Sequence, residues 1–414
     1  MDKNECLKII LGNKYYTIND LRYNQKIGYM FSKEVLMDFL NEKENLIDEK
    51  ATFIESLPLK SFNSKHCFYV NGKYLCSNYI QYLSTLVEDY KLNQKTLLER
   101  HVDDIIMSRV FSEVEGSLNV ENIPTTHKRI KEIFSKQSLV DKNDIIVRNM
   151  LNAMKYIVKE KPTFNKDNLL KLYNILSCDS LDEEDKLKEG AYYRHESVFI
   201  GGYEGAKVEI IDECMDSLFA FVNNPESIKK HAALLPHICH YYILYVHPYF
   251  DYNGRTARMV SFWLHYLFNI SEAPLFISEA INDNKKKYYE AISSTRNTNN
   301  DLTYFLGYVL ETSIKYSLLY KNLEEIQKHL SKTGDSLTST EWGYVKKIIV
   351  HNPDGYFNYK NFFEYIKNYM SKAGGLKILN TFVEYGILEK TINKKKEAVY
   401  KVNQNLIIYQ MKED

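Results

Sequence analysis

The sequence predicts a mainly α-helical protein of several domains, and three observations support this prediction. Apolar residues recur at helical spacing along most of the chain, strand-like runs are short and few, and the chain has 414 residues. Domain-size statistics favour roughly two to four units at this length. We therefore expect a small α+β region at 1–96, a helical domain at 97–330 and a third module at 337–414.

The region 1–96 carries a hairpin signal. The helical domain that follows is expected to begin with a long helix. At residues 67–74, Asn71-Gly72 favours a two-residue turn between two strands. The first long helix is expected from Leu97 to Leu118, with Gly116 as its stop signal.

Helical periodicity continues through the middle of the chain with one interruption. The segment 190–207 has a strand-like run followed by Gly201-Gly202, which predicts a β-hairpin. Helices are expected at 143–159, 166–176, 209–223, 229–246, 255–269, 284–296 and 302–329.

The last module follows a polar stretch, 331–336, which is the best linker candidate. Three helices are expected at 339–351, 359–370 and 373–385, followed by strands at 388–392 and 398–402. Helices followed by a basic hairpin resemble a winged-helix module. DNA binding would use the helix 373–385 and the basic tip Lys394-Lys395-Lys396. A solvated hairpin or a protein-docking module explains the pattern equally well, and both interpretations stay open.

Composition and charge limit the function classes. No run approaches the roughly 18 apolar residues of a membrane span, and the N-terminus lacks the basic and apolar segments of a secretory signal. We expect no membrane insertion and a cytoplasmic location. Basic and acidic residues number 54 each, so no overall charge attracts nucleic acid. The six cysteines have no metal or disulfide spacing and are expected to be reduced thiols in the core.

The residues with the strongest chemical signal are 247–258, HPYFDYNGRTAR, which we call the signature segment. It lies between two apolar helical patterns, and such flanking helices would hold it rigidly. The start of a helix offers unpaired N–H groups and a positive dipole, so Asn253, Gly254 and Arg255 predict an anion cradle suited to phosphates. Arg255 and Arg258 stand out because the chain has only nine arginines, and an arginine fork binds phosphate with two prongs.

Two further residues of this segment suit phosphate chemistry. Asp251 offers the hard oxygen ligand that Mg²⁺ prefers. His247 has the side chain whose ordinary pKa suits a general base acting on a hydroxyl. Taken singly, a histidine after a helix or an Asx-Gly turn is usually structural. The combination has a chance frequency on the order of 10⁻⁸ over the chain.

The signature segment resembles the signature of Fic domains, His-x-Phe-x-(Asp/Glu)-Gly-Asn-Gly-Arg-x-x-Arg, and a weaker resemblance extends over 97–320. Such domains mostly transfer AMP from Mg-ATP to a Tyr, Ser or Thr hydroxyl of a target protein. The resemblance implies a Fic-type helical bundle with a β-hairpin flap. It implies that His247 is the base, that Asp251 is the Mg²⁺ ligand, and that the cradle Asn253, Gly254 and Arg255 binds phosphates. Arg258 would clamp the γ-phosphate, and the flap at 190–202 would hold the target by strand pairing.

The sequence departs from the family pattern at two positions. Tyr249 replaces phenylalanine, and its hydroxyl needs a partner if it is buried. Tyr252 replaces a small residue before Asn253, where a bulky side chain would strain the turn or narrow the phosphate pocket.

Many Fic proteins also carry an inhibitory helix with the pattern (Ser/Thr)-x-x-x-Glu-(Gly/Asn), whose glutamate pairs with the second arginine of the signature. Glu115-Gly116 fits the end of this pattern, although Phe111 occupies the Ser/Thr position. We therefore predict that Glu115 pairs with Arg258 and inhibits the enzyme; the alternative is an ordinary exposed glutamate near a helix end.

The sequence thus predicts an autoinhibited AMP transferase that uses ATP and Mg²⁺. One alternative at the same site is removal of AMP from a modified protein, with Glu115 positioning a water, or transfer of another phosphate-bearing group. Another is a DNA-binding regulator that senses nucleotide, with Tyr252 impairing catalysis. The target protein and homo-oligomer formation stay open, because strand pairing through the backbone carries little side-chain information.

Overall fold

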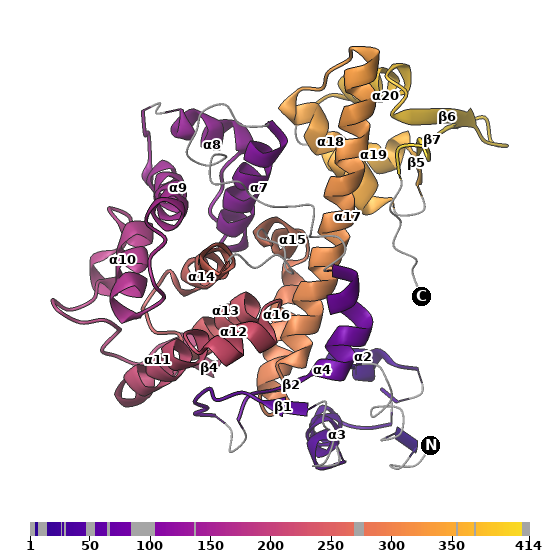
Figure 1. Ribbon diagram of the computed structural model, residues 1–414. Helices are drawn as coiled ribbons and strands as arrows, with labels where there is room; N and C mark the ends of the chain where they lie inside the picture. Colours follow the sequence, from indigo (N-terminus) through magenta and orange to yellow (C-terminus); the bar gives the residue numbers. More distant parts are fainter. Residues whose placement is uncertain are drawn as a thin grey trace. The chain divides into compact units, whose positions relative to one another are not determined.

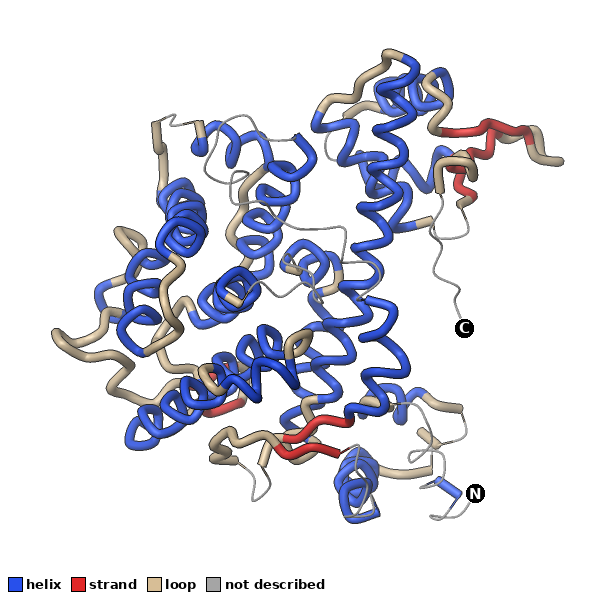
Figure 2. Tube along the Cα trace, in the orientation of Figure 1, coloured by secondary structure: helices blue, strands red, loops and turns tan. Residues whose placement is uncertain are grey.

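The computed structural model describes residues 5–6, 15–25, 27–28, 30–46, 54–63, 67–83, 104–135, 138–268, 277–352, 355–367 and 370–407. The chain divides into two compact units, Met1–Ser313 and Ile314–Asp414 (Figure 1). The predicted mainly α fold is confirmed, since strands form only three small sheets within the described residues (Figure 2). The finer three-part division of the chain stays a prediction.

The beginning of the first unit combines short helices with a two-stranded sheet. The sheet pairs β1 (Ile54–Ser56) with β2 (Tyr69–Asn71) in antiparallel register. The helical elements here are α2 (Ile18–Tyr23), α3 (Lys33–Leu46), α4 (Gly72–Leu75) and the π-helix η1 (Cys76–Ile80).

The hairpin expected at Asn71-Gly72 is wrong. Asn71 ends β2 and caps α4, because its side-chain oxygen accepts the Tyr74 N–H at 2.9 Å. Asparagine serves a helix N-cap as readily as a turn, so the local signal was ambiguous.

The helices of the first unit lie where periodicity predicted, with small differences in their ends. Capping explains their starts: the side chains of Asp141 and Asn165 accept N–H groups in the first turns of α9 and α10. The predicted helix 229–246 is two helices, α12 and α13, and α8 and α15 were not predicted. The elements are α7 (Asp104–Val120), α8 (His127–Phe134), α9 (Lys142–Glu160), α10 (Lys166–Ser177), η2 (Glu183–Asp185), α11 (Val208–Val222), α12 (Pro225–His231), α13 (Leu235–Val246), α14 (Asn253–Leu267), α15 (Ser278–Asp283), α16 (Lys285–Asn297) and α17 (Thr303–Thr333).

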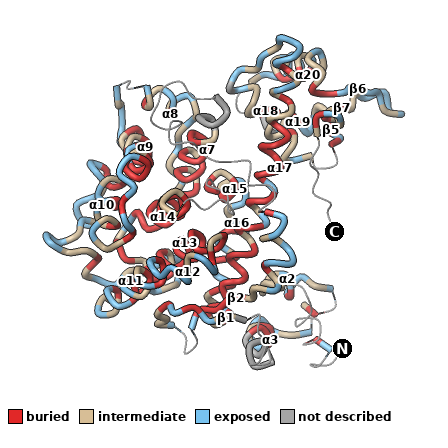
Figure 3. The backbone as a smooth tube through the Cα atoms, viewed as in Figure 1, coloured by how far each residue is buried: buried red, intermediate tan, exposed pale blue. Residues whose placement is uncertain are grey.

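The core of this unit is built around α13 and α14, which lie side by side and are buried along most of their lengths (Figure 3). Aromatic residues fill it: Trp263 packs edge-on against Phe164, and its indole N–H donates to Pro162 O at 2.9 Å. Two helices buried on nearly all sides give the connection between them a rigid mount.

Helix α7 continues to Val120, two residues beyond the predicted end at Leu118, so Gly116 does not act as a stop. A Cβ at Gly116 would lie 2.6 Å from the backbone of Glu279, so this glycine permits the close crossing of α7 and α15. Glu113 joins the same helices, because its carboxylate accepts the Ser278 N–H at 2.6 Å and the Ser278 hydroxyl. The predicted start of this helix at Leu97 lies outside the described residues.

The predicted β-hairpin is present as β3 (Phe199–Ile200) and β4 (Tyr203–Glu204). Gly201 and Gly202 form its turn with φ values of 53° and 87°, which glycine adopts without strain. Phe199, which belongs to the flap segment 190–202 named above, is 73% exposed at this hairpin.

The second unit carries the remaining helices and a three-stranded sheet. Its elements after α17 are α18 (Ser339–His351), β5 (Tyr356–Asn358), α19 (Tyr359–Ile366), α20 (Lys372–Glu384), β6 (Leu388–Ile392) and β7 (Ala398–Val402), with sheet order β5-β7-β6. Strand β5 was not predicted. Because α17 runs to Thr333, half of the expected linker at 331–336 is helical. The winged-helix assignment stays a prediction.

Two compositional expectations are also testable. None of the six cysteines forms a disulfide, but Cys67, Cys76 and Cys178 are exposed, so the expectation that all lie in the core is wrong. Within the described ranges, no helix has both the length and the apolar character required to cross a membrane.

Candidate nucleotide-binding and catalytic site

The signature segment connects α13 to α14 through a tightly fixed turn. His247 ends α13 in the left-handed region, with φ 53°, and its N–H donates to Ile243 O at 2.9 Å. The Asn253 side chain then holds the turn closed. It accepts the Tyr249 N–H at 3.0 Å and donates to Tyr249 O at 2.8 Å. Asn253 therefore shapes the loop through its amide group.

Tyr249 is fully buried and anchors the turn in the core. Its ring stacks on Tyr173 with centroids 3.8 Å apart and an interplanar angle of 12°. We expected the buried hydroxyl to have a partner, but within the described residues it makes no hydrogen bond. The ring contact therefore accounts for the anchoring, and the hydroxyl adds none of it.

The start of α14 has backbone N–H groups that no carbonyl inside the helix accepts, and its role as an anion cradle stays a prediction. The first backbone bond in the helix runs from Thr256 N–H to Tyr252 O, and the Tyr252 side chain does not cap the helix. The N–H groups of Asn253, Gly254 and Arg255 therefore have no acceptor inside the helix. A Cβ at Gly254 would overlap the carboxylate oxygen Oε1 of Glu121. A carboxylate of the chain itself thus lies against the predicted phosphate cradle.

The same carboxylate binds the second arginine of the segment. Arg258 is 3% exposed, and its Nη2 donates to Glu121 Oε1 at 2.7 Å. Arg258 also donates to Ser117 at two points: Nε to the hydroxyl at 2.8 Å and Nη2 to the carbonyl at 3.0 Å. Burial by itself raises the pKa of Glu121, but the Arg258 charge outweighs it and the pKa lies below its usual value. Glu121 is therefore ionised at neutral pH.

This contact corrects the prediction that Glu115 pairs with Arg258. Glu121 lies just beyond the end of α7, six residues after Glu115, and reaches the start of α14. The reason is that α7 continues through Gly116, so the helix end falls later than the sequence analysis placed it.

A sequence signal for Glu121 was present and was missed. Residues 117–122 read SLNVEN, which fits the pattern (Ser/Thr)-x-x-x-Glu-(Gly/Asn) at every fixed position. Our interpretation relied on a glycine after the glutamate and accepted a mismatch at Phe111. The pattern with asparagine would have identified Ser117 and Glu121, the two residues that contact Arg258.

Asp251 and Arg255 form the outer part of the site. The Arg255 Nη2 lies 3.2 and 3.1 Å from the two Asp251 oxygens, and the Asp251 side chain is 51% exposed. Among the described residues, no group of three or more His, Cys, Asp or Glu side chains is arranged to hold a metal ion. Mg²⁺ generally uses one or two carboxylates plus substrate phosphates, so a single exposed carboxylate beside a phosphate cradle fits such a site.

His247 is held neutral by its surroundings. Burial lowers the pKa of its imidazole to about 4, and the nearby Arg194 charge acts in the same direction. A neutral imidazole has a nitrogen lone pair and can accept a proton from a hydroxyl.

Arg194 is a further residue that the sequence analysis noted only as part of the flap. Its guanidinium is almost completely buried and donates to three backbone carbonyls, those of His247 (2.8 Å), Glu196 (2.5 Å) and Ala206. The His247 carbonyl belongs to the turn after α13, and the other two carbonyls lie before β3 and after β4. Arg194 therefore fixes the flap to the backbone of His247. No sequence spacing signals this role, because the contacts go to carbonyls that any residue offers.

Comparison with known proteins relates this site to one family. Residues 163–265 match the model of the Fic/DOC family. A protein named protein adenylyltransferase Fic from Aedes aegypti is 25% identical over 213 residues, 48% of this chain and 41% of its own length. The protein of that name from Drosophila melanogaster is 24% identical over 217 residues, 51% of this chain and 42% of its own.

The likeness to solved structures concerns the fold. The solved structure of Fic-1 (aa134 - 508) from C. elegans aligns with a TM-score of 0.51 at 16% identity, covering 78% of this chain and 84% of that one. The chain therefore spans less than half the length of the curated relatives it matches, while most of its fold has a solved counterpart.

Proposed function

We propose that this chain transfers AMP from ATP to a hydroxyl side chain of a target protein and that Glu121 inhibits the transfer, because residues 163–265 match the model of the Fic/DOC family. One observation carries the proposal: the Glu121 carboxylate lies on the cradle at the start of α14 and on Arg258. Carboxylate and phosphate oxygens satisfy the same donors. The resting chain thus fills, with its own anion, the site that a nucleotide phosphate needs.

The proposed transfer uses His247 as the base. Its neutral imidazole takes the proton of the target hydroxyl while the hydroxyl oxygen attacks the α-phosphorus of ATP. A new phosphorus–oxygen bond forms, the bond from the α-phosphorus to the bridging oxygen breaks, and pyrophosphate leaves. Arg255 and the N–H groups of the cradle stabilise negative charge on the phosphates in a mostly water-excluded site. Arg258 binds the γ-phosphate once Glu121 has moved away.

Asp251 is the residue proposed to hold Mg²⁺. Its exposed carboxylate lies beside the cradle, and the rest of the coordination would come from phosphate oxygens and water. When bound, the ion neutralises phosphate charge and orients the polyphosphate. The proposed docking site for the target is the flap. Among the described residues, β3 pairs with β4 and with no other strand, and Phe199 is exposed.

A direct test is incubation of the purified chain with α-³²P-labelled ATP, Mg²⁺ and a cell lysate. The Glu121→Gly variant is expected to label proteins more strongly than the wild type, and Glu121→Gly with His247→Ala is expected to label none. Labelling that is equal in both Glu121→Gly proteins would contradict the base assignment. Loss of label from premodified protein, without any gain from ATP, would favour removal of AMP at the same site.

A second candidate function, DNA binding by the second unit, is supported by the order of its elements. Helices α19 and α20 are followed by the β6-β7 hairpin, as in a helix-turn-helix with a wing. Lys372, Lys377 and Asn380 are exposed on α20, and Lys394, Lys395 and Lys396 are exposed at the hairpin tip. Residues 359–402 contain nine lysines and four glutamates, so this part is basic in a chain without net charge.

The test for DNA binding is a titration with a fluorescent duplex at several salt concentrations. Changing Lys394, Lys395 and Lys396 to Ala should weaken binding to all sequences and lower the salt slope by up to about three. Transfer activity should be unaffected. If the wild-type chain has no salt-sensitive affinity for duplex DNA, the protein-docking interpretation of this module replaces the DNA-binding one.

A further inference from the structure

Tyr252 occupies an unusual position in the signature segment. Its backbone lies in the left-handed region, at φ 67° and ψ 5°, immediately before the first residue of α14. A side chain with a Cβ disfavours this conformation, and glycine adopts it without cost. The fully buried tyrosine must therefore make contacts that offset the strain.

The first contact is between the Tyr252 ring and the cradle arginine. The Arg255 Cζ lies 3.3 Å from the ring centroid, so the guanidinium rests on the aromatic face. Both residues are buried. An aromatic ring attracts a cation most strongly where water is excluded, and the flat ring also limits the rotation of the guanidinium.

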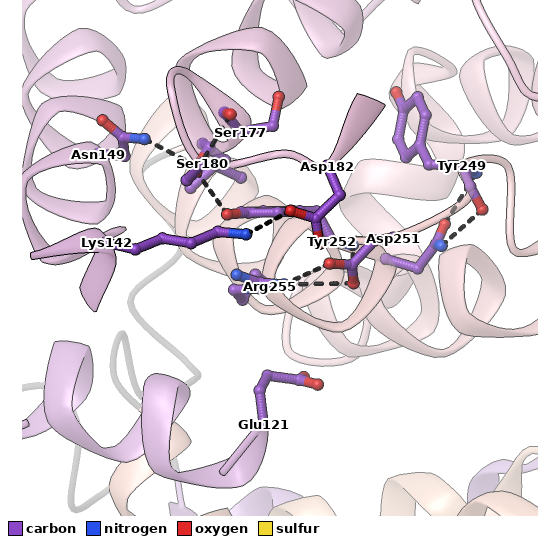
Figure 4. A network of polar contacts seen from close by, with 12 residues as sticks. Glu121, Lys142, Asn149, Ser177, Ser180, Asp182, Tyr249, Asp251, Tyr252 and Arg255 are labelled. Atoms are coloured by element: carbon purple, nitrogen blue, oxygen red, sulfur yellow. Dashed lines mark hydrogen bonds and ion pairs between the residues drawn. The ribbon is translucent and has the colours of Figure 1, made fainter. Parts of the chain in front are cut away.

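The second contact holds Arg255 from another side. Its Nη2 pairs with both oxygens of Asp251, and the Tyr252 N–H donates to Asp251 Oδ1 at 2.6 Å. Arg255 is thus held between a ring and a carboxylate that are themselves joined through the Tyr252 backbone (Figure 4). Its Nε is buried and has no hydrogen-bond partner among the described residues. A buried cationic N–H donor without a partner calls for an anionic ligand.

The third contact fixes Tyr252 itself. Its hydroxyl lies 2.6 Å from Ser180 Oγ, and Ser180 Oγ lies 3.1 Å from the Ser177 carbonyl. The single serine proton is used by that carbonyl, so the Tyr252 hydroxyl donates to Ser180 (Figure 4). Ser180 follows α10, in the stretch that leads to the flap. The hydroxyl of the ring that lies over Arg255 therefore bonds to the buried Ser180 in the segment after α10.

We propose that Tyr252 is a positioning residue that fixes Arg255 for the polyphosphate of a nucleotide before the nucleotide binds. The unpartnered Nε of Arg255 and the open N–H groups at the start of α14 then receive phosphate oxygens without a further change of the arginine. Tyr252 sets the affinity for the nucleotide, and proton transfer at His247 does not depend on it. This inference rests on the proposed function only in taking a nucleoside triphosphate as the ligand.

The test is calorimetric titration of Mg-ATP into Glu121→Gly proteins that differ at residue 252. Tyr252→Leu keeps the bulk and the strained backbone but removes the aromatic face, and it should weaken binding by about 10- to 30-fold. Tyr252→Gly removes the strain as well and should weaken binding by a similar factor. Tyr252→Phe keeps the ring and loses only the bond to Ser180, so binding should stay within about threefold of the parent.

Two measurements, the kinetic constants and Tm, separate a positioning role of Tyr252 from a purely structural one. In transfer assays, Tyr252→Leu should raise KM for ATP by about the factor seen in the titration and change kcat by less than about threefold. A purely structural residue would lower Tm without changing the affinity measured well below Tm. That result overturns the proposal, and so does tighter binding by Tyr252→Gly, since the ring would then obstruct the pocket.

The same experiments distinguish failure of the positioning role from failure of the proposed transferase function. If Mg-ATP binding depends on residue 252 as expected but no protein is labelled, the transferase proposal fails and the positioning role stands. If labelling is strong while binding is insensitive to Tyr252→Leu, the positioning role fails and the transferase proposal stands. If the Glu121→Gly protein does not bind Mg-ATP at all, both fail.

Discussion

Two carboxylates, one within α7 and one just beyond its end, are affected in opposite ways by their surroundings in the first unit. Glu113 is buried, and the Glu121 side chain is 29% exposed. Glu113, in the middle of the helix, accepts hydrogen bonds from Ser278, and burial raises its pKa to about 7. Glu121, beyond the helix end, contacts Arg258 and has a lowered pKa. One carboxyl group joins two helices, and the other pairs with a buried arginine. The comparison teaches that the donor facing a carboxyl group decides the direction of its pKa shift, and desolvation alone does not.

The largest expected effect concerns the reaction that Glu121 is proposed to block. His247→Ala in the Glu121→Gly background should lower the transfer rate by about 10²- to 10⁴-fold, because no other group takes the proton. Affinity for Mg-ATP should change little, since the imidazole makes no phosphate contact in this scheme. Single-turnover labelling measures the transfer rate, and a parallel titration measures the affinity for Mg-ATP. Full labelling by the double variant would show that the activated reaction does not pass through His247.

The pH dependence of stability should separate the two carboxyl groups next. Glu113 binds a proton more tightly in the folded chain than in the unfolded one, where its pKa is 4.5. Its contribution is therefore present at low pH and lost as pH rises from about 4.5 to 7, on the order of 3 kcal/mol. Glu121 has the opposite sign: its contribution is present above pH 4.5 and lost as pH falls.

Denaturant unfolding from pH 3 to 8 measures these slopes, because the loss assigned to Glu121 occurs below pH 4.5. Glu113→Gln should flatten the loss of stability between pH 5 and 7, and Glu121→Gln should flatten the loss on the acid side. Identical pH profiles for both variants would remove the distinction between the two sites.

A substitution at Arg258 tests whether Glu121 acts through this arginine. It leaves α7 unchanged. Glu121→Gly alone should raise the affinity for Mg-ATP by about 10- to 100-fold, and adding Arg258→Ala should remove this gain. The two effects cannot be additive, because both residues act in one pocket. A double-mutant cycle on the Mg-ATP affinity gives the coupling. Additive effects would mean that Glu121 acts somewhere other than at Arg258.

The smallest expected effect tests how α7 is held against α15. Gly116→Ala adds one methyl group that would lie 2.6 Å from the Glu279 backbone, so α7 and α15 must separate slightly. We expect a loss of about 1–2 kcal/mol in the free energy of unfolding, at the low end for overpacking. Glu115→Ala, one residue earlier on the same helix, is the matched control. Equal stability of Gly116→Ala and the wild type would show that the crossing tolerates a side chain.

What the sequence could and could not predict follows from how local each signal is. A helix that starts close to Asn253, Gly254 and Arg255 depends on neighbouring residues, so it was readable, while the use of these residues as a phosphate cradle stays a prediction. The strands at 388–392 and 398–402 were placed correctly for the same reason. The contact between Arg258 and Glu121 spans 137 positions. The sequence offers two partial or complete matches to the inhibitory pattern, Glu115-Gly116 and residues 117–122, and helix signals near Gly116 do not decide between them. The turn at Asn71-Gly72 failed because asparagine also caps helices.

The most direct test of the account is the affinity of three proteins for Mg-ATP, measured by calorimetry under one set of conditions. The wild type, with Glu121 on the cradle, should bind weakly, and Glu121→Gly should bind about 10- to 100-fold more tightly, because a charge-assisted contact of about 1.5–3 kcal/mol no longer competes. Glu115→Gly, the control on the same helix, should bind like the wild type. Equal affinities of the wild type and Glu121→Gly, or a gain in Glu115→Gly alone, would contradict the claim that Glu121 occupies the nucleotide's phosphate site.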